Sequence, residues 1–269
     1  MPKALLDGTM MEIHNNKLMD KKIELSVIIP AYNEAGRITE TLQQTWAYLA
    51  NQPFFSEIIV IDDGCTDTTI DVVQGLFYQI PNLRLIRHRQ NQGKGQAVKT
   101  GVNAARGRWI LFMDADLATP ITELQKLWSC KEKYDVLIGS RYLLSDSIKT
   151  PQPWYRQLFS FLGRLMIRTL LLPNIHDTQC GFKLFSHKVA HDLFNRLTID
   201  RFGFDIEILS LATTLGYQVQ EIAVDWNHQP HGTINIYRDN YRVFFEVLRI
   251  KYRISQSLWN KTGYTQKIF

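Results

Sequence analysis

The amino-acid sequence predicts an α/β protein with a single domain, in which helices flank a mostly parallel central sheet. Short apolar runs of strand length alternate with longer segments of helical periodicity from residue 25 to residue 141, which is typical of such sheets. The 269 residues are 45% hydrophobic and 21% charged, an ordinary balance for a packed globular protein. No low-complexity tract, repeat or linker-like run divides the chain. We therefore predict one domain over residues 25–255, between an N-terminal extension (1–24) and a C-terminal tail (256–269).

The first half of the domain contains five predicted strands, each an apolar run that ends in polar or turn-forming residues. These strands are 25–30, 57–64, 82–88, 108–116 and 134–141. The segments between them place apolar residues three and four positions apart, so they are predicted as helices. These helices are 34–50, 67–79, 94–107 and 119–133. Thr66 or Asp67 can cap the second helix, and Thr119 followed by Pro120 can begin the fourth.

The second half of the domain, residues 142–255, is less regular. Predicted helices cover 157–172, 204–216 and 240–253, and a predicted strand covers 217–226. Residues 177–190 pass through a turn into a further element.

Polar residues recur where the predicted strands end, and ligands of parallel sheets bind beyond those ends. They are Tyr32, Asn33 and Glu34 after the first strand, Asp62 and Asp63 after the second, Asp114 and Asp116 after the fourth, and Arg141 after the fifth. Because these strand ends share one edge of the sheet, we expect one binding site there.

Asp114 and Asp116 form the clearest candidate site, directly after a buried apolar run. If the strand continues through them, both carboxylates lie on the same side and face one point. Carboxylate oxygens suit Mg²⁺ or Mn²⁺, which can in turn hold a diphosphate. An acidic turn with a helix-capping role is the structural alternative. The preceding strand and the other strand-end acids favour the metal site.

Two further stretches are compatible with a nucleotide. Asp62 and Asp63 can accept hydrogen bonds from a base N–H or a ribose hydroxyl, although Asp-Asp-Gly is equally typical of a turn. Residues 93–95, Gly-Lys-Gly, form a basic turn before a helix N-terminus, which favours anions, but the P-loop order is absent. The sequence also lacks a Gly-x-Ser-x-Gly elbow, a Cys-x-x-Cys pair and a Gly-x-Gly-x-x-Gly turn. These absences disfavour hydrolase, redox and NAD-dependent functions.

The net charge of +5 and a sequence pI near 9.0 predict an anionic partner. Basic residues gather in the last part of the chain: Arg238, Arg242, Arg249, Lys251 and Arg253. Charge alone is equally compatible with a solvated helix face. The three cysteines have no paired spacing, which argues against a disulfide framework or a zinc site and fits a reducing compartment.

Residues 158–173 are the most apolar stretch, but Arg164 and Arg168 interrupt it. Such a segment is typical of an interfacial or buried helix rather than a spanning one. No transmembrane segment is predicted, so membrane contact is expected to be peripheral, through this helix and the basic C-terminal helix. The expected location is the cytoplasm, on the cytoplasmic face of a membrane, and no nucleic-acid partner is predicted.

Seven ordered motifs between residues 25 and 250 resemble a known enzyme family. SVIIPAYNEAGRI, IIVIDDGCTD, NQGKGQAVKTG, WILFMDADLATP and IGSRY together resemble the inverting family 2 glycosyltransferases with a GT-A fold. DTQCGFKLF and RFGFDIEIL resemble a narrower group, the dolichyl-phosphate β-glucosyltransferases and related polyprenyl-phosphate glycosyltransferases. The resemblance implies a nucleotide-sugar half over residues 25–141 and an acceptor half, with amphipathic helices, over residues 142–255.

The resemblance also implies a role for each candidate residue. The implied nucleotide-binding residues are Pro30, Ala31, Tyr32, Glu34, Asp62, Asp63, Lys94, Asp114 and Ala115. Asp114 and Asp116 would hold Mg²⁺ or Mn²⁺ on the diphosphate. Arg141 would meet the diphosphate or the acceptor phosphate, and Asp177 matches the acid proposed as a catalytic base in such enzymes, although an orienting role is equally open.

The implied reaction moves a sugar, expected to be glucose, from a nucleotide sugar, expected to be UDP-glucose, to a polyprenyl or dolichyl phosphate. Relatives often carry Gly-Ser-Lys where this chain has Gly232-Thr233-Ile234, so Arg238, His228 or His231 would have to replace the missing cation. A soluble or saccharide acceptor is one alternative, in which Asp177 or Asp205 acts as a true base. A nucleotide-sugar-binding module without turnover is another.

Overall fold

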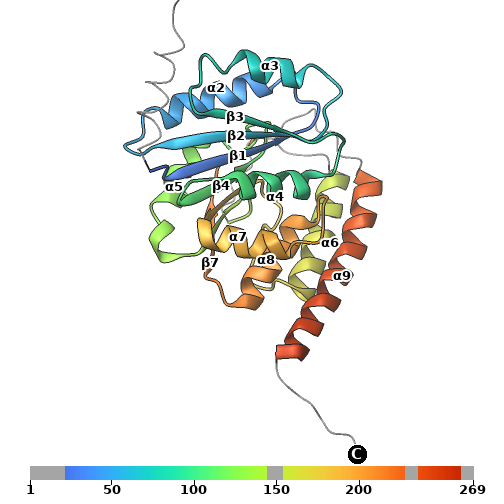
Figure 1. The fold of residues 1–269 in the computed structure, drawn as a ribbon. Coiled ribbons are helices and arrows are strands. Elements are labelled where there is room, and N and C mark those ends of the chain that lie inside the picture. The colour runs from blue at the N-terminus through green and yellow to red at the C-terminus, as the bar shows by residue number, and fades with distance from the viewer. Residues whose placement is uncertain (1–21, 144–153, 228–235, 262–269) are drawn as a thin grey trace, which may run out of the picture.

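The centre of the molecule is a seven-stranded sheet with the strand order β3-β2-β1-β4-β6-β5-β7 (Figure 1). The computed structural model describes the backbone of residues 22–143, 154–227 and 236–261, and the side chains of these except 154–160, 236–243 and 257–261. The strands are β1 (Leu25–Ala31), β2 (Ser56–Asp62), β3 (Leu83–Arg87), β4 (Trp109–Met113), β5 (Val136–Ser140), β6 (Phe182–Ser186) and β7 (Val219–Ala223). All neighbouring pairs are parallel except those of β6, which runs antiparallel to β4 and β5. The predicted mostly parallel α/β sheet is confirmed.

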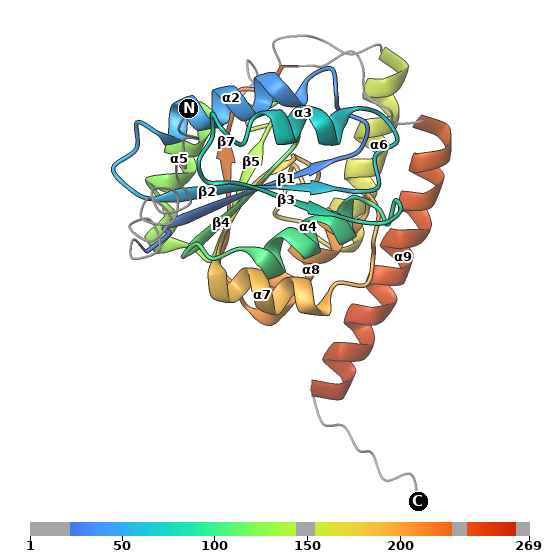
Figure 2. The same cartoon turned by 45° about the horizontal axis from the view of Figure 1, so that its top comes forward.

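Helices cover both faces of this sheet (Figures 1 and 2). They are α2 (Ile38–Leu49), α3 (Thr69–Gly75), α4 (Lys94–Ala104), α5 (Leu124–Trp128), α6 (Trp154–Leu170), α7 (His187–Arg196), α8 (Phe204–Leu215) and α9 (Ile236–Lys261). Ile28 of β1 packs into the cluster formed with α4, α7 and α8, whereas Val27 and Ile29 pack into the cluster formed with α2, α3 and α5. A strand buried on both faces explains why β1 is a nearly continuous apolar run.

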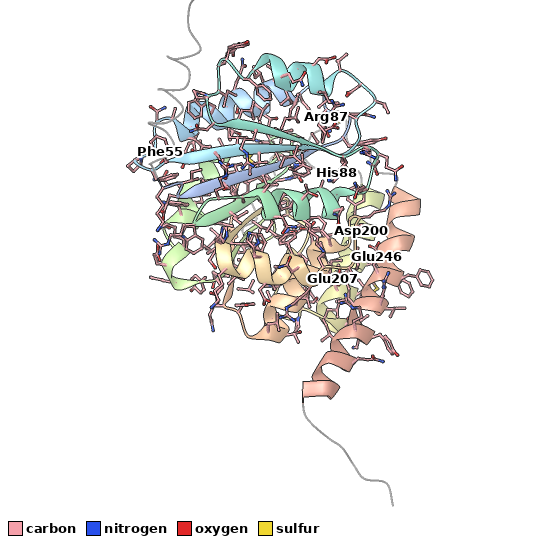
Figure 3. The ribbon with its side chains drawn as sticks, in the orientation of Figure 1. Phe55, Arg87, His88, Asp200, Glu207 and Glu246 are labelled. Carbon is pink, nitrogen blue, oxygen red and sulfur yellow. The ribbon has the colours of Figure 1, made fainter. Side chains whose placement is uncertain are left out.

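Helix α9 packs against α8 and along α6. Arg253 of α9 forms an ion pair with the buried carboxylate of Glu207 on α8. Glu207 in turn accepts hydrogen bonds from the backbone N–H groups of Thr198 (3.1 Å) and Ile199 (2.8 Å). Figure 3 shows Glu207 and Glu246 near the contact between α8 and α9. Gly203, just before α8, leaves room for the Glu246 carboxylate, which a Cβ at position 203 would overlap.

The structure refines several of the predicted segments. Residues 177–190 lead into strand β6, which inserts antiparallel between β4 and β5, and then into the first residues of helix α7. The helix predicted over 119–133 is a shorter helix, α5, between two 3₁₀ turns. The helix predicted over 240–253 is the central part of the longer α9. Among the described residues, no helix combines the length and the apolar character that crossing a bilayer requires.

The close contact between α4 and β1 gives a testable prediction. A Cβ at Gly101 of α4 would overlap the Cγ2 atom of Ile28, whereas a Cβ at Gly75 of α3 has no neighbour within 4 Å. Gly101→Ala should therefore lower the free energy of unfolding by about 1–3 kcal/mol through overpacking. The matched control Gly75→Ala should leave it unchanged or raise it by up to about 1 kcal/mol. Urea unfolding measures both, and equal stability of the two variants would refute the close packing.

Candidate functional site

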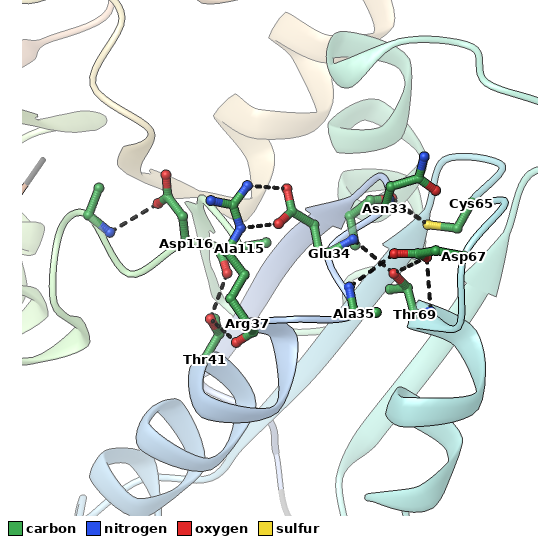
Figure 4. Close-up of polar contacts among 12 residues, drawn as sticks. Asn33, Glu34, Ala35, Arg37, Thr41, Cys65, Asp67, Thr69, Ala115 and Asp116 are labelled. Atoms are coloured by element: carbon green, nitrogen blue, oxygen red, sulfur yellow. Dashed lines mark hydrogen bonds and ion pairs between the residues drawn. The ribbon is translucent and has the colours of Figure 1, made fainter. Parts of the chain in front are cut away.

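The loops that follow β1 and β2 are bound to each other at the carboxyl edge of the sheet (Figure 4). Asn33 adopts a positive φ of 58°, and its Oδ1 accepts a hydrogen bond from the Thr66 N–H (2.8 Å). The Glu34 N–H donates to Thr69 Oγ1 (2.8 Å) and the Ala35 N–H donates to Asp67 Oδ2 (3.2 Å). These hydrogen bonds join the loop after β1 to the loop after β2.

The predicted nucleotide residues at β1 differ in their exposure. Pro30 and Ala31 lie within the strand, and the Ala31 carbonyl accepts a hydrogen bond from the Asp63 N–H (2.9 Å). The Tyr32 side chain is exposed. Glu34 forms an ion pair with Arg37, which raises the pKa of Arg37 despite partial burial. Sequence reasoning missed Arg37, although its spacing of three residues from Glu34 is that of a helical ion pair.

Asp62 and Asp63 are buried and make hydrogen bonds within the protein. Asp62 Oδ1 accepts a hydrogen bond from the Cys65 N–H (2.7 Å). The Asp63 carboxylate accepts four hydrogen bonds from residues 88–93: from His88 Nδ1 (2.8 Å), Asn91 Nδ2 (2.9 Å), Gln92 N (2.9 Å) and Gly93 N (2.9 Å). Asp63 therefore fixes the turn that leads into Lys94. Contact of either carboxylate with a nucleotide stays a prediction.

Lys94 and the two aspartates after β4 lie together at the same edge. Strand β4 ends at Met113, so the expected extension of the strand through Asp116 is wrong; a turn with Leu117 at a φ of 55° takes its place. Lys94 Nζ lies 2.6 Å from Asp114 Oδ1. Burial lowers the pKa of Lys94, but the nearby carboxylates of Asp114 and Asp205 outweigh it and raise the pKa overall.

The charge of the Asp114 carboxylate affects the ionisation of Asp116. Burial and the Asp114 carboxylate together raise the pKa of Asp116, although its Oδ1 accepts a hydrogen bond from the Ala118 N–H (3.0 Å). The neighbouring Ala115 is buried, and its carbonyl accepts a hydrogen bond from Thr41 Oγ1 (2.6 Å; Figure 4). The backbone around residue 115 is thereby anchored to α2, and the two carboxylates flank the anchored residue.

The chemistry of these two aspartates fits a divalent cation. A cation between two repelling carboxylates would relieve the repulsion, and Mg²⁺ commonly uses one or two carboxylates together with water and phosphate oxygens. Gly181 makes room for this arrangement, because a Cβ there would overlap the Asp114 carboxylate. In the part of the chain that the structure describes, no group of three or more His, Cys, Asp or Glu side chains forms a preassembled metal cage. The residues therefore suit a cation that a bound phosphate helps to hold.

Arg141, after β5, is held by Asp177 in a bidentate ion pair. Arg141 Nε lies 2.7 Å from Asp177 Oδ2, its Nη2 lies 2.8 Å from Oδ1, and its backbone N–H donates to Oδ2 (3.0 Å). Burial alone would raise the pKa of Asp177, but the Arg141 guanidinium lowers it below the ordinary value. Only 1% of the Asp177 surface is exposed. Both carboxylate oxygens of Asp177 therefore contact Arg141, and the role of Asp177 as a base or as an orienting group stays a prediction.

The turn that carries Asp177 is itself held by Glu221 of β7. Glu221 Oε1 accepts a hydrogen bond from the Asp177 N–H (2.8 Å), and its Oε2 accepts one from the His176 N–H (2.9 Å). The other end of the same segment, residues 177–181, contacts the residue that follows β4, since the Asp114 N–H donates to the Gly181 carbonyl (3.0 Å). One short segment therefore contacts both Arg141 and Asp114.

Lys183 and Asp205 form a buried ion pair that sequence reasoning missed. Lys183 lies on β6 and its Nζ contacts the Asp205 carboxylate and donates to the Cys180 carbonyl (2.6 Å). Burial raises the pKa of Asp205, against the opposing effects of Lys183 and Lys94. A lysine between the apolar residues of "GFKLF" was the available signal. Asp205, the alternative base, therefore already has a cationic partner.

Arg238, the remaining residue predicted to bind the acceptor phosphate, is only partly described by the structure. Arg238 lies on α9, but its side chain is outside the described part of the chain. His228, His231 and residues 232–234 also fall outside it.

The buried ion pair between Lys183 and Asp205 predicts a loss of stability when one partner is removed and a recovery when both are replaced. Lys183→Met should lower the free energy of unfolding by about 3–5 kcal/mol, because the Asp205 carboxylate stays buried without its partner. Adding Asp205→Leu should recover most of this loss. Arg196→Met, which removes the exposed pair with Asp192, is the control and should cost less than about 1 kcal/mol. Urea unfolding gives all values, and no recovery in the double variant would contradict the pairing.

The chain is similar to a known protein family and to individual proteins. Residues 26–194 match the family described as glycosyl transferase family 2. The dolichyl-phosphate beta-glucosyltransferase of Dictyostelium discoideum is 34% identical over 257 residues, which cover 91% of this chain and 79% of that protein. The enzyme of the same name from Drosophila melanogaster is 37% identical over 219 residues, covering 76% of this chain and 67% of that protein.

A solved structure shares the fold at low sequence identity. It is glucosyl-3-phosphoglycerate synthase from Mycobacterium tuberculosis in complex with Mn²⁺, UDP-glucose and phosphoglyceric acid, with a TM-score of 0.65 and 17% identity. The alignment covers 91% of this chain and 85% of that one. The predicted GT-A fold is therefore confirmed. Together with the match over residues 26–194, these similarities show that the chain belongs to glycosyl transferase family 2 and is a glycosyltransferase.

Proposed function

We propose that this glycosyltransferase moves glucose from UDP-glucose to the phosphate of a polyprenyl or dolichyl phosphate, with inversion at the anomeric carbon. Two relatives that it matches over most of their length are named dolichyl-phosphate beta-glucosyltransferases. The structural neighbour from Mycobacterium tuberculosis was solved with Mn²⁺ and UDP-glucose, and also with Mg²⁺ and UDP. These names and ligands support glucose, uridine diphosphate and a divalent cation as the components of the reaction.

The observation that carries the proposal is the segment 177–181, which contacts Asp114 at one end and Arg141 at the other. Gly181 lies against Asp114, the predicted ligand of the cation on the donor diphosphate. Asp177 orients Arg141, whose planar guanidinium suits a phosphate. The reaction joins a diphosphate donor and a phosphate acceptor, and the segment contacts one group suited to each.

In the proposed reaction, a phosphate oxygen of the acceptor attacks the anomeric carbon from the face opposite UDP. The new oxygen–carbon bond forms as the bond to the diphosphate oxygen breaks, and the electron pair leaves with UDP. A cation held by Asp114 and Asp116 would neutralise charge on the departing diphosphate. Lys94, beside Asp114, adds a second positive charge at this place.

On the acceptor side, the proposed reaction depends more on positioning the phosphate than on removing a proton from it. A phosphate monoester has a second pKa of about 6, so its oxygens are largely ionised near neutral pH. Arg141 binds this phosphate and Asp177 keeps the guanidinium in place. We assign Pro30, Ala31, Tyr32, Glu34 and Ala115 to the walls of the nucleotide site, and Asp62 and Asp63 to the part of it that binds the base and the ribose.

The direct test is glucosyl transfer to a short-chain polyprenyl phosphate. With labelled UDP-glucose and Mn²⁺, the protein should form a chloroform-soluble glucosyl lipid, and Asp116→Asn should lower the rate at least about a hundredfold. Asp71→Asn, on the acidic first turn of α3, is the matched control. Tight UDP binding without product from any sugar nucleotide would instead indicate a binding module. Transfer to a saccharide but not to the lipid phosphate would indicate a different acceptor.

The role of Asp177 predicts a particular kinetic change. Asp177→Asn should raise the KM for the acceptor about 10–100-fold through misplacement of Arg141, while the KM for UDP-glucose stays near the wild-type value. Asp192→Asn, which weakens an exposed pair with Arg196, is the control. Steady-state kinetics with each substrate varied separate the two constants. A loss confined to kcat, with the acceptor KM unchanged, would identify Asp177 as a base and overturn the orienting role.

A further inference from the structure

The guanidinium of Arg141 lies within reach of two aromatic rings. Its Cζ is 5.4 Å from the centre of the Tyr142 ring and 5.4 Å from the centre of the Trp226 ring, over the ring in each case. A cation is attracted to the face of an aromatic ring within about 6 Å of the ring centre. Tyr142 is the next residue along the chain, whereas Trp226 lies beyond β7. The fold therefore brings Trp226 to Arg141, which chain connectivity alone would not do.

The Asp177 carboxylate restrains this guanidinium along one edge. Both side-chain hydrogen bonds, from Nε and from Nη2, leave the same edge of the planar group. Hydrogen bonds to one edge fix where the group lies and how it is turned within its plane, but they resist a tilt of that plane only weakly. A ring that the guanidinium packs over blocks such a tilt by direct contact. The ion pair and the aromatic contact therefore restrain different movements of Arg141.

The backbone that carries Trp226 is held independently of Arg141. The N–H groups of residues 224–227 donate to the carbonyls of Ser140 (3.1 Å) and Ala118 (2.8 Å) and to the Glu123 carboxylate (3.0 Å). Ser140 is the last residue of β5, and Ala118 belongs to the turn after β4. The position of the indole ring is therefore set by the sheet and by this turn, so the ring can act as a fixed stop for the arginine side chain.

The Tyr142 ring faces a second cation as well as Arg141. The Arg164 guanidinium of α6 lies 3.9 Å from the centre of this ring, closer than the 5.4 Å of Arg141. A substitution of Tyr142 would therefore change the contacts of two arginines at once. Trp226 is half-buried, outside the two clusters of core residues. Trp226 is thus the ring whose effect on Arg141 can be measured by itself.

The guanidinium of Arg141 is largely removed from water and keeps its charge. Only 18% of the Arg141 side chain is exposed. Burial lowers the pKa of Arg141, but the Asp177 carboxylate outweighs this effect and raises the pKa above its ordinary value. In surroundings of low polarity, a guanidinium interacts more strongly with an aromatic ring and with an anion than it does in water. The aromatic contact therefore acts on a charged group that has little further hydration to lose.

We propose that Trp226 is a positioning residue for the acceptor phosphate and that it acts through Arg141. Asp177 sets the place of the guanidinium and its turn within the plane, and the Trp226 ring keeps the plane from tilting away. The N–H donors that Asp177 does not use are thereby held in one direction, toward the acceptor phosphate. The phosphate rests on the proposed function, whereas the restraint of Arg141 by Trp226 does not.

Steady-state kinetics test the effect on the acceptor. With a short-chain polyprenyl phosphate and UDP-glucose, Trp226→Leu should raise the KM for the acceptor about tenfold, while kcat and the KM for UDP-glucose change less than about twofold. Trp226→Phe keeps an aromatic face and should recover most of the loss. Phe77→Leu, at an exposed aromatic residue beyond α3, is the matched control and should behave as the wild type does. An unchanged acceptor KM in Trp226→Leu, an equal rise of both KM values, or no recovery in Trp226→Phe would overturn the proposal.

Nuclear magnetic resonance tests the restraint without any substrate. Protons over the face of an aromatic ring resonate at lower frequency, and the Arg141 Nε–H, which donates to Asp177, gives such a signal. Trp226→Leu should move this signal to higher frequency, and Trp226→Phe should restore part of the shift. Its loss in Arg141→Lys assigns it. The Arg196 Nε–H, which donates to Asp192 (3.0 Å), is the internal reference and should not move. An unmoved Arg141 signal in Trp226→Leu would overturn the proposal.

The two measurements together separate this proposal from the proposed function. Absence of transfer by every form of the protein, while the Arg141 signal still depends on Trp226, would refute the function and leave the restraint intact. Transfer by Trp226→Leu with wild-type constants and an unmoved Arg141 signal would refute the positioning role and leave the function intact.

Discussion

The bidentate ion pair between Arg141 and Asp177 joins the end of β5 to the segment that enters β6, at the edge of the sheet where the candidate site lies. Arg141 follows β5, whereas Asp177 lies on the segment that enters β6, and Glu221 of β7 holds that segment from the other side. A guanidinium and a carboxylate in this geometry make two parallel charge-assisted hydrogen bonds, so both position and orientation are fixed. The pair is best understood as a device for orientation, since buried ion pairs add little net stability.

The reversed direction of β6 explains how one segment contacts both Asp114 and Arg141. A parallel strand in this position would begin at the opposite edge of the sheet. Because β6 runs antiparallel to β4 and β5, its first residue lies at the edge where those strands end. Residues 177–181 therefore enter the sheet between Asp114 and Arg141. Lys183, two residues further along, carries the positive charge below this edge and is neutralised by Asp205.

Local patterns predicted much of the fold, and long-range contacts account for most of what they missed. The apolar runs at β1, β2, β4 and β5 and the helical spacing of α2 and α4 depend on nearby residues, so the sequence indicated them correctly. The antiparallel insertion of β6 depends on pairing with strands more than forty residues away along the chain, to which periodicity is insensitive. Likewise, the partners of Lys183 and Arg141 lie 22 and 36 residues away, and no local pattern identifies them.

The acidic residues at the strand ends of the candidate site were visible in the sequence, but their surroundings were not. Asp114 and Asp116 lie in a turn, and Asp63 accepts hydrogen bonds from residues 88–93.

The four hydrogen bonds on Asp63 have a thermodynamic consequence for whatever binds beside Lys94. The turn from His88 to Gly93 is ordered by a carboxylate that belongs to the folded core, so its conformational entropy is lost when the chain folds. Ligand binding then includes no comparable ordering cost for this turn, which is the usual benefit of a preorganised site. The binding entropy at Lys94 should therefore be governed by the release of water and by the ligand's own loss of freedom.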